Sequence, residues 1–596
     1  MAFKLASLET ILDRFWNTFK RFPLAIIVAI AGTVTLMLTL DIDEWELQQD
    51  LIRVTLACIV VMPALIAVGT FGEARRVSDL WAWAMKVLVL ALGVVFWLTV
   101  DHLEGYKYPV VFLLLVLATH LMVAFAPWIG GKKEGFWQYN KQLFLQILVA
   151  VIYSGVLFAG LAIAILAVDQ LFNADIEEET YMRLFFFIGG VFNTIFFLSG
   201  VPRDYQVLET DESYPKGLKI FTQYVLLPLV FIYLVILYAY MAKILIQAEW
   251  PVGWVSILVL CFSIAGIFSF LLIYPLRNKQ EERWISVFNR WFYIALIPLT
   301  VMLFVAIFKR LQQYGFTEER YFVLLLAFWL TGIIAYFLLS KKDDIRVIPV
   351  SLFVLSLAAV FTAFPIARMS QLNRFEDMLE KYDLLEDGKI KLGDKEPDFA
   401  MEKDLSSIFD FLDDREDMTY IQPYVSFDLD SLEAEVNKGK KRGGRIGSRV
   451  MSELGMTYRS KYSHAPTSGN EFETYTYYGP ANESFEIAGF EQMRRQYFNE
   501  NINYEDKEPY ILYEEGIGYV VTYKEKKLPV DLVAFAQKMA RENPKGTYDP
   551  LDEILLEAEN EELALRLYFI DFRFEMDKDK KIEDISGSVW MLVREQ

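Results

Sequence analysis

The sequence predicts an α-helical polytopic membrane bundle of about 11 transmembrane helices, followed by a soluble α+β domain. Two observations predict this class. The first 370 residues contain apolar stretches close to the ~20 residues that cross a ~30 Å hydrocarbon core, and the last 226 residues contain none. Residues 1–370 hold 28 basic and 28 acidic residues, so the net charge of −19 lies on residues 371–596. The chain therefore divides at about residue 370.

Residues 1–22 predict an amphipathic helix that precedes the first span. Apolar residues recur at helical spacing on one face: Leu5, Leu8, Ile11, Leu12, Phe15, Trp16 and Phe19. Such a helix lies in the membrane interface or packs against the bundle, and the pattern fits both. The first apolar stretch has no small-residue cleavage pattern, so no cleaved signal peptide is expected.

Residues 23–370 form the predicted transmembrane domain. Each stretch must be helical, because an isolated strand in lipid leaves its backbone polar groups unpaired. The predicted spans are Pro23–Leu40, Leu51–Thr70, Trp81–Val100, Tyr108–Pro127, Leu143–Val168, Met182–Gly200, Ile220–Lys243, Trp254–Pro275, Phe292–Ile307, Tyr321–Leu339 and Val347–Pro365.

The charge of the loops between these spans alternates. The N-terminal tail and every second loop hold 19 basic residues, whereas the loops on the other side hold 7. Basic residues are retained on the cytoplasmic side, so we expect the N-terminus in the cytoplasm of a bacterial inner membrane. Eleven crossings then place residues 371–596 in the periplasm, and a miscount of one helix would reverse that placement.

Polar side chains at membrane depth are costly and are therefore functional candidates. His120, beside Thr119, is the deepest titratable candidate. It could bond a neighbouring helix or belong to a proton relay, and the first is the more common role. The scarcity of such groups argues against an ion-coupled pump, but a carrier of apolar cargo remains open.

Aromatic and polar residues gather at the predicted membrane surfaces. Phe136–Asn140 lies on the cytoplasmic side, and the segments 249–254 and 314–321 lie on the outer side. Aromatic residues at these heights usually anchor helices. The outer segments also carry charges, and Glu249, Glu318 and Arg320 could face one another across the outer mouth of a cavity. A structural ion pair is the more common role of such charges, and a substrate site, to which Trp250 would also belong, is the alternative.

At these clusters the sequence resembles a bacterial family of multi-pass membrane proteins catalogued as domain of unknown function 4153. The matching stretches are Arg21–Pro23, Phe136–Asn140, Pro215–Tyr240, Glu249–Trp254, Tyr314–Tyr321, Ile348–Leu352 and Ser370–Arg374. The resemblance covers roughly residues 20–375. It implies an integral inner-membrane protein and supplies no reaction, substrate or catalytic residue.

Residues 371–596 predict a domain in which helices mostly precede strands. Asp398–Arg415 has helical spacing, and Val530–Ala540 is a second helix. Phe472–Tyr478 is a strand, Tyr510–Tyr513 and Tyr519–Tyr523 form a hairpin, and Leu565–Phe574 pairs with Ile582–Val593. The aromatic residues of this domain suit a glycan or protein surface if exposed, and ordinary sheet packing if buried.

The sequence contains no recognisable catalytic constellation. The Gly-rich loop Gly439–Arg445 lacks the phosphate-binding pattern, and no zinc spacing, calcium loop or nucleophile elbow is present. We therefore expect no catalytic residue, no metal and no cofactor. Enzymatic activity is left open, with a non-enzymatic role favoured.

Two functions follow. In the first, the bundle anchors an extracytoplasmic domain that binds an envelope protein, glycan or lipid. In the second, the bundle is a transporter or lipid-handling permease, with the C-terminal domain as its gate. The bilayer is a partner in both, and nucleic acid is not, because an acidic domain repels it. The oligomeric state and the cargo are not encoded in any pattern that we recognise.

Overall fold

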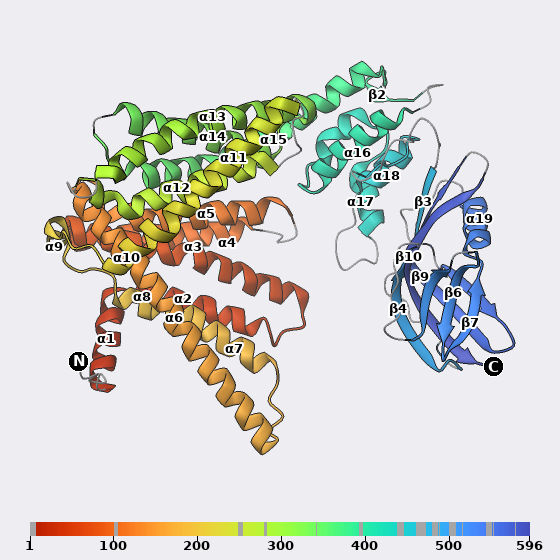
Figure 1. Cartoon of the computed structure of the whole chain (residues 1–596), viewed down its shortest axis with the longest axis horizontal. Coiled ribbons are helices and arrows are strands. Elements are labelled where there is room, and N and C mark those ends of the chain that lie inside the picture. Colours follow the sequence, from red (N-terminus) through yellow and green to blue (C-terminus); the bar gives the residue numbers. More distant parts are fainter. Residues whose placement is uncertain are drawn as a thin grey trace. The chain divides into compact units, whose positions relative to one another are not determined.

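A computed structural model describes residues 8–100, 105–247, 254–278, 283–340, 342–392, 397–437, 446–460, 473–479, 487, 489–499, 508–514, 516–543, 551, 553–577 and 580–596. The chain forms two compact units (Figure 1). The helical unit comprises Met1–Asp383 and Phe411–Phe427. The C-terminal unit comprises Leu384–Asp410 and Asp428–Gln596.

The helical unit is built from long apolar helices. Its elements are α1 (Leu8–Arg21), α2 (Pro23–Leu38), α3 (Trp45–Arg75), α4 (Asp79–Thr99), α5 (Lys107–Phe125), η1 (Ala126–Trp128), α6 (Lys133–Phe172), α7 (Glu179–Phe187), η2 (Ile188–Phe192), α8 (Asn193–Ser199), α9 (Tyr205–Thr210), α10 (Lys216–Phe221), η3 (Thr222–Leu226), α11 (Leu227–Gln247), α12 (Trp254–Ile273), η4 (Tyr274–Asn278), α13 (Arg283–Tyr314), α14 (Glu318–Leu339) and α15 (Val347–Lys381). Among the described residues, 10 helical segments are long and apolar enough to cross a membrane, or up to 11 if a bent pair is one span. The predicted class is confirmed.

The bent pair lies at the start of the chain. α1 meets α2 at an angle of 100°, with Phe22 between them and Pro23 at the first position of α2. Proline is favoured at that position because the N–H of the first helical residue has no hydrogen-bond partner within the helix. α2 then runs beside α3. At one end Arg21 pairs with Glu73, and at the other the amide of Gln48 donates to the carbonyl of Thr39.

α3 is the central helix of this part of the unit. In its most apolar window 56% of residues are buried, against 11% for α4 and for α6. It packs against α2, α4 and α5, while α13, α14 and α15 lie side by side (Figure 1). The enclosed face of α3 therefore helps to form the interior of the unit.

Polar contacts join loops at each end of the helices. At the α1 end, which carries Arg21, η1, α9 and residues 342–346, Arg75 donates to the carbonyl of Pro127 at 2.8 Å. There Arg346 donates to the carbonyls of Trp128 and Gly131, and Lys132 pairs with Glu209. These loops are the basic ones that the charge alternation groups on one side. At the opposite end Arg183 pairs with Asp41.

The segment Phe411–Phe427, with η6 (Met418–Tyr424), packs on the opposite end of the helical unit. Arg415 forms two hydrogen bonds to the carboxylate of Glu318, at 2.8 and 2.7 Å. Arg368 pairs with Asp417 at 3.1 Å, and the hydroxyl of Tyr424 donates to Glu376. Burial raises the pKa of Asp417 above its ordinary value, against the opposing effect of Arg368.

The C-terminal unit has the predicted α+β composition. Its elements are β1 (Leu385–Glu386), β2 (Lys389–Ile390), α16 (Phe399–Asp413), α17 (Leu429–Asn437), α18 (Gly447–Glu453), β3 (Glu473–Tyr478), β4 (Gln492–Phe498), β5 (Tyr510–Glu514), β6 (Gly518–Tyr523), β7 (Lys526–Val530), α19 (Leu532–Glu542), β8 (Leu555–Glu559), β9 (Leu563–Met576) and β10 (Ile582–Glu595). The last three residues of α16 belong to the helical unit.

Its strands form antiparallel sheets. One sheet has the order β3-β9-β10-β4, with β8 also paired to β9, and another has the order β5-β6-β7. The predicted hairpin and the predicted final antiparallel pair are confirmed by β5–β6 and by β9–β10. Both sheets and α19 contribute to one hydrophobic core. Of the aromatic residues noted in the sequence, Tyr475 and Tyr477 are buried in it, while Tyr478 and Tyr497 are exposed.

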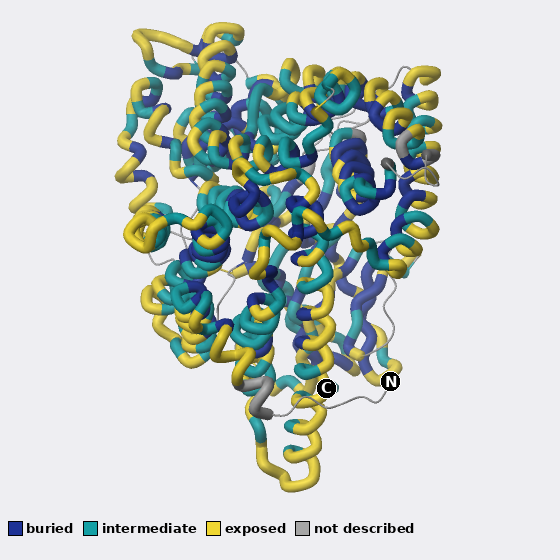
Figure 2. Tube along the Cα trace, turned by 90° about the vertical axis from the view of Figure 1, so that its left-hand side faces the viewer, coloured by how far each residue is buried: buried dark blue, intermediate teal, exposed yellow. Residues whose placement is uncertain are grey.

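The hairpin of α6 and α7 is a largely exposed part of the helical unit. It is the lowest part of Figure 2, where most residues are coloured as exposed. α6 has 40 residues and is therefore about 60 Å long. Its second half exposes Val156 and Leu171, and α7 exposes Phe185. This surface is apolar, as expected for helices that face lipid.

Candidate functional site

A cavity of about 700 Å³ lies inside the helical unit, towards the α1 end. Its walls come from α3, α5, α6, α8, α12 and the start of α15. The lining is Met62, Pro63, Ile66, His120, Leu121, Val123, Ala124, Phe136, Trp137, Asn140, Lys141, Leu143, Phe144, Ile147, Val151, Asn193, Thr194, Phe197, Phe268, Leu271, Leu272, Ile345, Ile348 and Pro349. The volume falls within the ~300–1,000 Å³ that is usual for ligand sites.

Local sequence features shape three walls of the cavity. Pro63 interrupts the hydrogen bonding of α3 where that helix lines the cavity. The π-helical turn η2 precedes Asn193 and Thr194, and such turns are frequent at functional sites. The first turns of α6 supply Phe136, whose neighbour Trp137 donates its indole N–H to the carbonyl of Leu271 at 2.7 Å. The proline in α3, the π-helical turn η2 and the indole hydrogen bond of Trp137 therefore shape the walls of the cavity.

The lining is mainly apolar, and its polar members lie on α5, α6 and α8. The amide of Asn140 donates to the carbonyls of Ala124 and Phe136, at 3.1 and 2.9 Å. The bond to Ala124 joins α6 to α5, whereas the bond to Phe136 lies within α6. Because Asn140 and Ala124 are neighbours on antiparallel helices, His120 lies about one helical turn deeper than Asn140. The polar groups of α5 and α6 therefore lie at different depths along the cavity.

His120 is exposed within this cavity. Its Nδ1 lies 2.8 Å from the carbonyl oxygen of Val116, one turn earlier in α5. The ring is thereby fixed against its own helix.

Lys141 is a cation of the lining, and it is already engaged. Its ammonium group donates to Oε1 of Gln138 and to the carbonyl of Ser213, and it lies 3.7 Å from Asp211. Only 9% of the Lys141 side chain is exposed. At Asp211, burial acts to raise the pKa, but hydrogen bonds from Ser213 and the charge of Lys141 outweigh it and lower the pKa.

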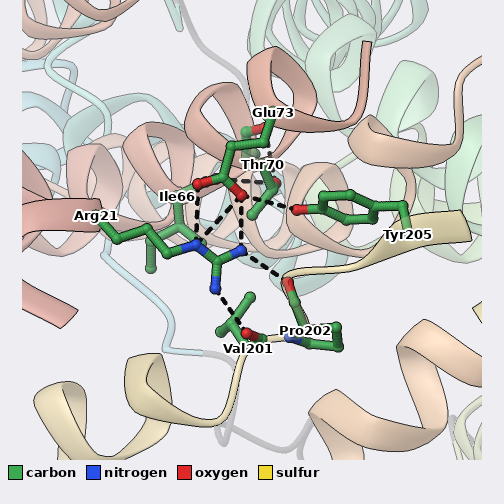
Figure 3. A network of polar contacts seen from close by, with 8 residues as sticks. Arg21, Ile66, Thr70, Glu73, Val201, Pro202 and Tyr205 are labelled. Atoms are coloured by element: carbon green, nitrogen blue, oxygen red, sulfur yellow. Dashed lines mark hydrogen bonds and ion pairs between the residues drawn. The ribbon is translucent and has the colours of Figure 1, made fainter. Parts of the chain in front are cut away.

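A polar network adjoins the cavity on α3. Figure 3 shows the Glu73 carboxylate between the Arg21 guanidinium and the Tyr205 hydroxyl, with bonds of 2.9 and 2.7 Å from Arg21 and 3.2 Å from Tyr205. Arg21 also donates to the carbonyls of Val201 and Pro202. The network ties α1, α3 and the loop before α9 together, one to two turns from Ile66 in the cavity wall.

The network shifts the titration of its members. Burial acts to lower the pKa of Arg21, but the hydrogen bonds and charge of Glu73 outweigh it and raise that pKa. Burial and the charge of Glu73 both raise the pKa of Tyr205. Arg21 therefore stays charged and Tyr205 stays protonated, which suits a structural tie.

A second polar cluster flanks Ile345 and Ile348 of the lining. Arg346 donates from Nε to Oδ1 of Asp344 at 2.9 Å, and Arg277 pairs with Asp343. Burial of Asp344 acts to raise its pKa, but the hydrogen bonds from Arg346 outweigh burial and lower the pKa. These ion pairs fix the loop between α14 and α15 beside the cavity.

The structure separates the site residues expected from the sequence. His120 lines the cavity, whereas Glu318 is buried with Arg415 at the opposite end. Arg320 donates to the carbonyls of Tyr314 and Gly315 and stacks on the Tyr314 ring. Glu249 and Trp250 lie outside the described residues. A substrate-binding role for these residues therefore stays a prediction.

Sequence reasoning did not identify the cavity. Two stretches that carry the family resemblance contribute to its lining, Phe136–Asn140 and Ile348–Leu352. The first was interpreted as an interfacial anchor. Within the described part of the chain, no group of three or more His, Cys, Asp and Glu side chains could hold a metal ion.

Comparison with known proteins places the helical unit in a family. A family model described as "Domain of unknown function (DUF4153)" matches residues 24–374, which is more than half of the chain. An uncharacterized protein of Pasteurella multocida (strain Pm70) is 25% identical over 273 residues, which cover 44% of this chain and 46% of that protein. The chain thus spans less than half the length of this relative. No solved structure matches it significantly. The chain belongs to the DUF4153 family.

Proposed function

We propose that the protein is a lipid-handling membrane protein whose helical unit binds a lipid-like amphiphile in the cavity of α3, α5, α6, α8, α12 and α15. The observation that carries the proposal is an apolar cavity of about 700 Å³ inside helices that are long and apolar enough to span a bilayer. A closed bundle would instead have favoured a purely anchoring role.

The chemistry of the lining supports an apolar ligand. Most lining residues are aliphatic or aromatic, and the lining cation Lys141 is paired with Asp211. Apolar surface binds an alkyl chain through the hydrophobic effect, whereas a polar solute would lose its hydration without gaining partners. Ile147 and Phe268 in the wall are exposed, which supports entry from the surrounding lipid.

Filling the cavity should displace this ligand. We expect Ala124→Trp to reduce lipid that copurifies with the protein at least fivefold, because the indole would occupy volume between α5 and α6. The measurement is mass spectrometry of lipid retained after extended detergent washing. Ala159→Trp on the exposed part of α6 is the matched control and should retain wild-type lipid. Equal retention in both variants would contradict the proposal.

The second candidate is an anchor for an extracytoplasmic binding domain. The observation in its favour is that the C-terminal unit has its own core. The exposed Tyr478 and Tyr497 lie on strands at opposite edges of the sheet, which gives little support to one aromatic binding surface. The C-terminal unit on an unrelated single-span anchor should then keep its binding partner in crosslinking. Loss of that partner, with the unit folded, would count against anchoring.

We further propose the inner membrane as the location, with the N-terminus in the cytoplasm and the C-terminal unit outside it. The clustering of Arg21, Arg75, Lys132 and Arg346 at the α1 end supports this orientation. The number of crossings depends on α2. It packs along α3, a 31-residue candidate span, and the hydroxyls of Thr35 and Thr55 are hydrogen-bonded between the two helices at 2.8 Å, which supports α2 as the eleventh.

A reporter that is active only in the periplasm, fused after Gln596, tests this topology. We expect activity, because eleven crossings put the two ends of the chain on opposite sides. The same reporter placed after Asp211, in a loop at the α1 end, should be silent. A silent but stable fusion after Gln596 would mean an even number of crossings and a cytoplasmic C-terminal unit.

A further inference from the structure

The hydrogen bond within α5 determines which proton the neutral His120 ring carries. Nδ1 lies 2.8 Å from the carbonyl oxygen of Val116. A carbonyl oxygen only accepts hydrogen bonds, so Nδ1 must be the protonated nitrogen. In the neutral imidazole, Nε2 then carries a lone pair and is a hydrogen-bond acceptor.

Within the described residues, Nε2 of His120 has no hydrogen-bond partner. The ring is exposed, and it lines a cavity whose walls are mainly apolar. A polar atom at membrane depth without a partner is unfavourable. A ligand that donates a hydrogen bond to Nε2 would remove that cost.

The remaining polar groups of the lining favour an uncharged donor. The Asn140 amide is used by two carbonyls, and the Lys141 ammonium is used by Gln138, Ser213 and Asp211. An anionic headgroup would have to displace Asp211 from Lys141. Asn193 and Thr194 each carry donors and acceptors, so they tolerate a hydroxyl without selecting a charge.

We propose that the ligand is a long-chain amphiphile whose uncharged headgroup carries an O–H donor, and that Nε2 of His120 accepts from it. This inference rests on the proposed function and names its ligand class. The apolar walls on α3, α12 and α15 hold the alkyl chain, and His120 selects the headgroup. Its position one turn below Asn140 places the hydroxyl inside the cavity rather than at its rim.

Two matched probes test the inference on the full-length protein. 1-Hexadecanol has the hydroxyl donor, and 1-methoxyhexadecane has the same chain but no donor. In detergent, with binding followed by native mass spectrometry, we expect the wild-type protein to bind the alcohol about three- to tenfold more tightly than the ether, as one net hydrogen bond predicts. Equal binding of the two probes would overturn the inference without any mutant.

The variant His120→Phe separates the two proposals. It should bind the ether within about twofold of wild type and lose the preference for the alcohol, whereas His120→Gln, which retains an acceptor, should recover part of it. A preserved preference in His120→Phe would overturn the role of His120. Ala124→Trp should bind neither probe. Undiminished binding of both probes by that variant would show that the cavity is not the binding site, and it would overturn the proposed function as well.

Discussion

Replacing Arg415 with leucine is expected to destabilise the helical unit by about 3–5 kcal/mol, because it would leave the Glu318 carboxylate buried without its cation. Glu318 is fully buried at the first turn of α14, and the Arg415 side chain is 10% exposed. The guanidinium also packs against the rings of Tyr106 and Phe411. The measurement is the apparent melting temperature of the purified protein in detergent.

The double variant Glu318→Leu/Arg415→Met identifies the cause. Replacement of a buried ion pair by apolar residues is often neutral, so the double variant should recover most of the lost stability. Asp50→Asn, which breaks the ion pair between an exposed carboxylate and Arg53 on α3, should cost no more than about 1 kcal/mol. A double variant as unstable as Arg415→Leu would show that packing, rather than the unpaired charge, dominates.

Phe572→Ala is expected to destabilise the C-terminal unit by about 3–5 kcal/mol. Phe572 is fully buried on β9, between β3 and β10, and its ring centroid lies 4.9 Å from that of Phe569 and 5.3 Å from that of Phe535 on α19. Truncation leaves a cavity where the sheet packs against this helix. Calorimetry and limited proteolysis of the full chain measure the effect.

The comparison for this variant is Tyr497→Ala on β4. Tyr497 is 47% exposed, so its loss should cost about 1 kcal/mol or less. Lipid retained by the helical unit should be the same in both variants, because the described residues that line the cavity belong to that unit. If Phe572→Ala released the lipid without unfolding the helical unit, the two units would be energetically coupled.

The membrane-spanning elements could be predicted because their signal is local. A run of apolar residues of the right length determines a span by itself, whatever its neighbours are. The predicted first and last residues of the helices were less accurate. α6 begins at Lys133 although the predicted span began at Leu143, since its first turns carry Lys141 and aromatic residues rather than an apolar run.

The site could be predicted only in fragments. His120 was selected because of its depth, and that criterion is local. The cavity is not local, because residues from Met62 to Pro349 meet in it. Glu318 was expected near Arg320, but its partner is Arg415, 97 residues away, and no spacing along the chain indicates that pair. Long-range contacts between oppositely charged residues have no signature in one sequence.

The π-helical turn η2 has a consequence for how this family can vary. In a π-helix each bond spans one residue more than in an α-helix, so Ile188–Phe192 accommodate one residue beyond the regular repeat. Loss of one residue there would leave a regular α-helix whose two halves keep their present faces, whereas loss of one residue elsewhere in the span would rotate them against each other by about 100°. Asn193 and Thr194 would then stay in the cavity wall only if the loss fell within the π-helical turn. This turn is therefore the place in the span where relatives can lose a residue without a change in the lining on α8.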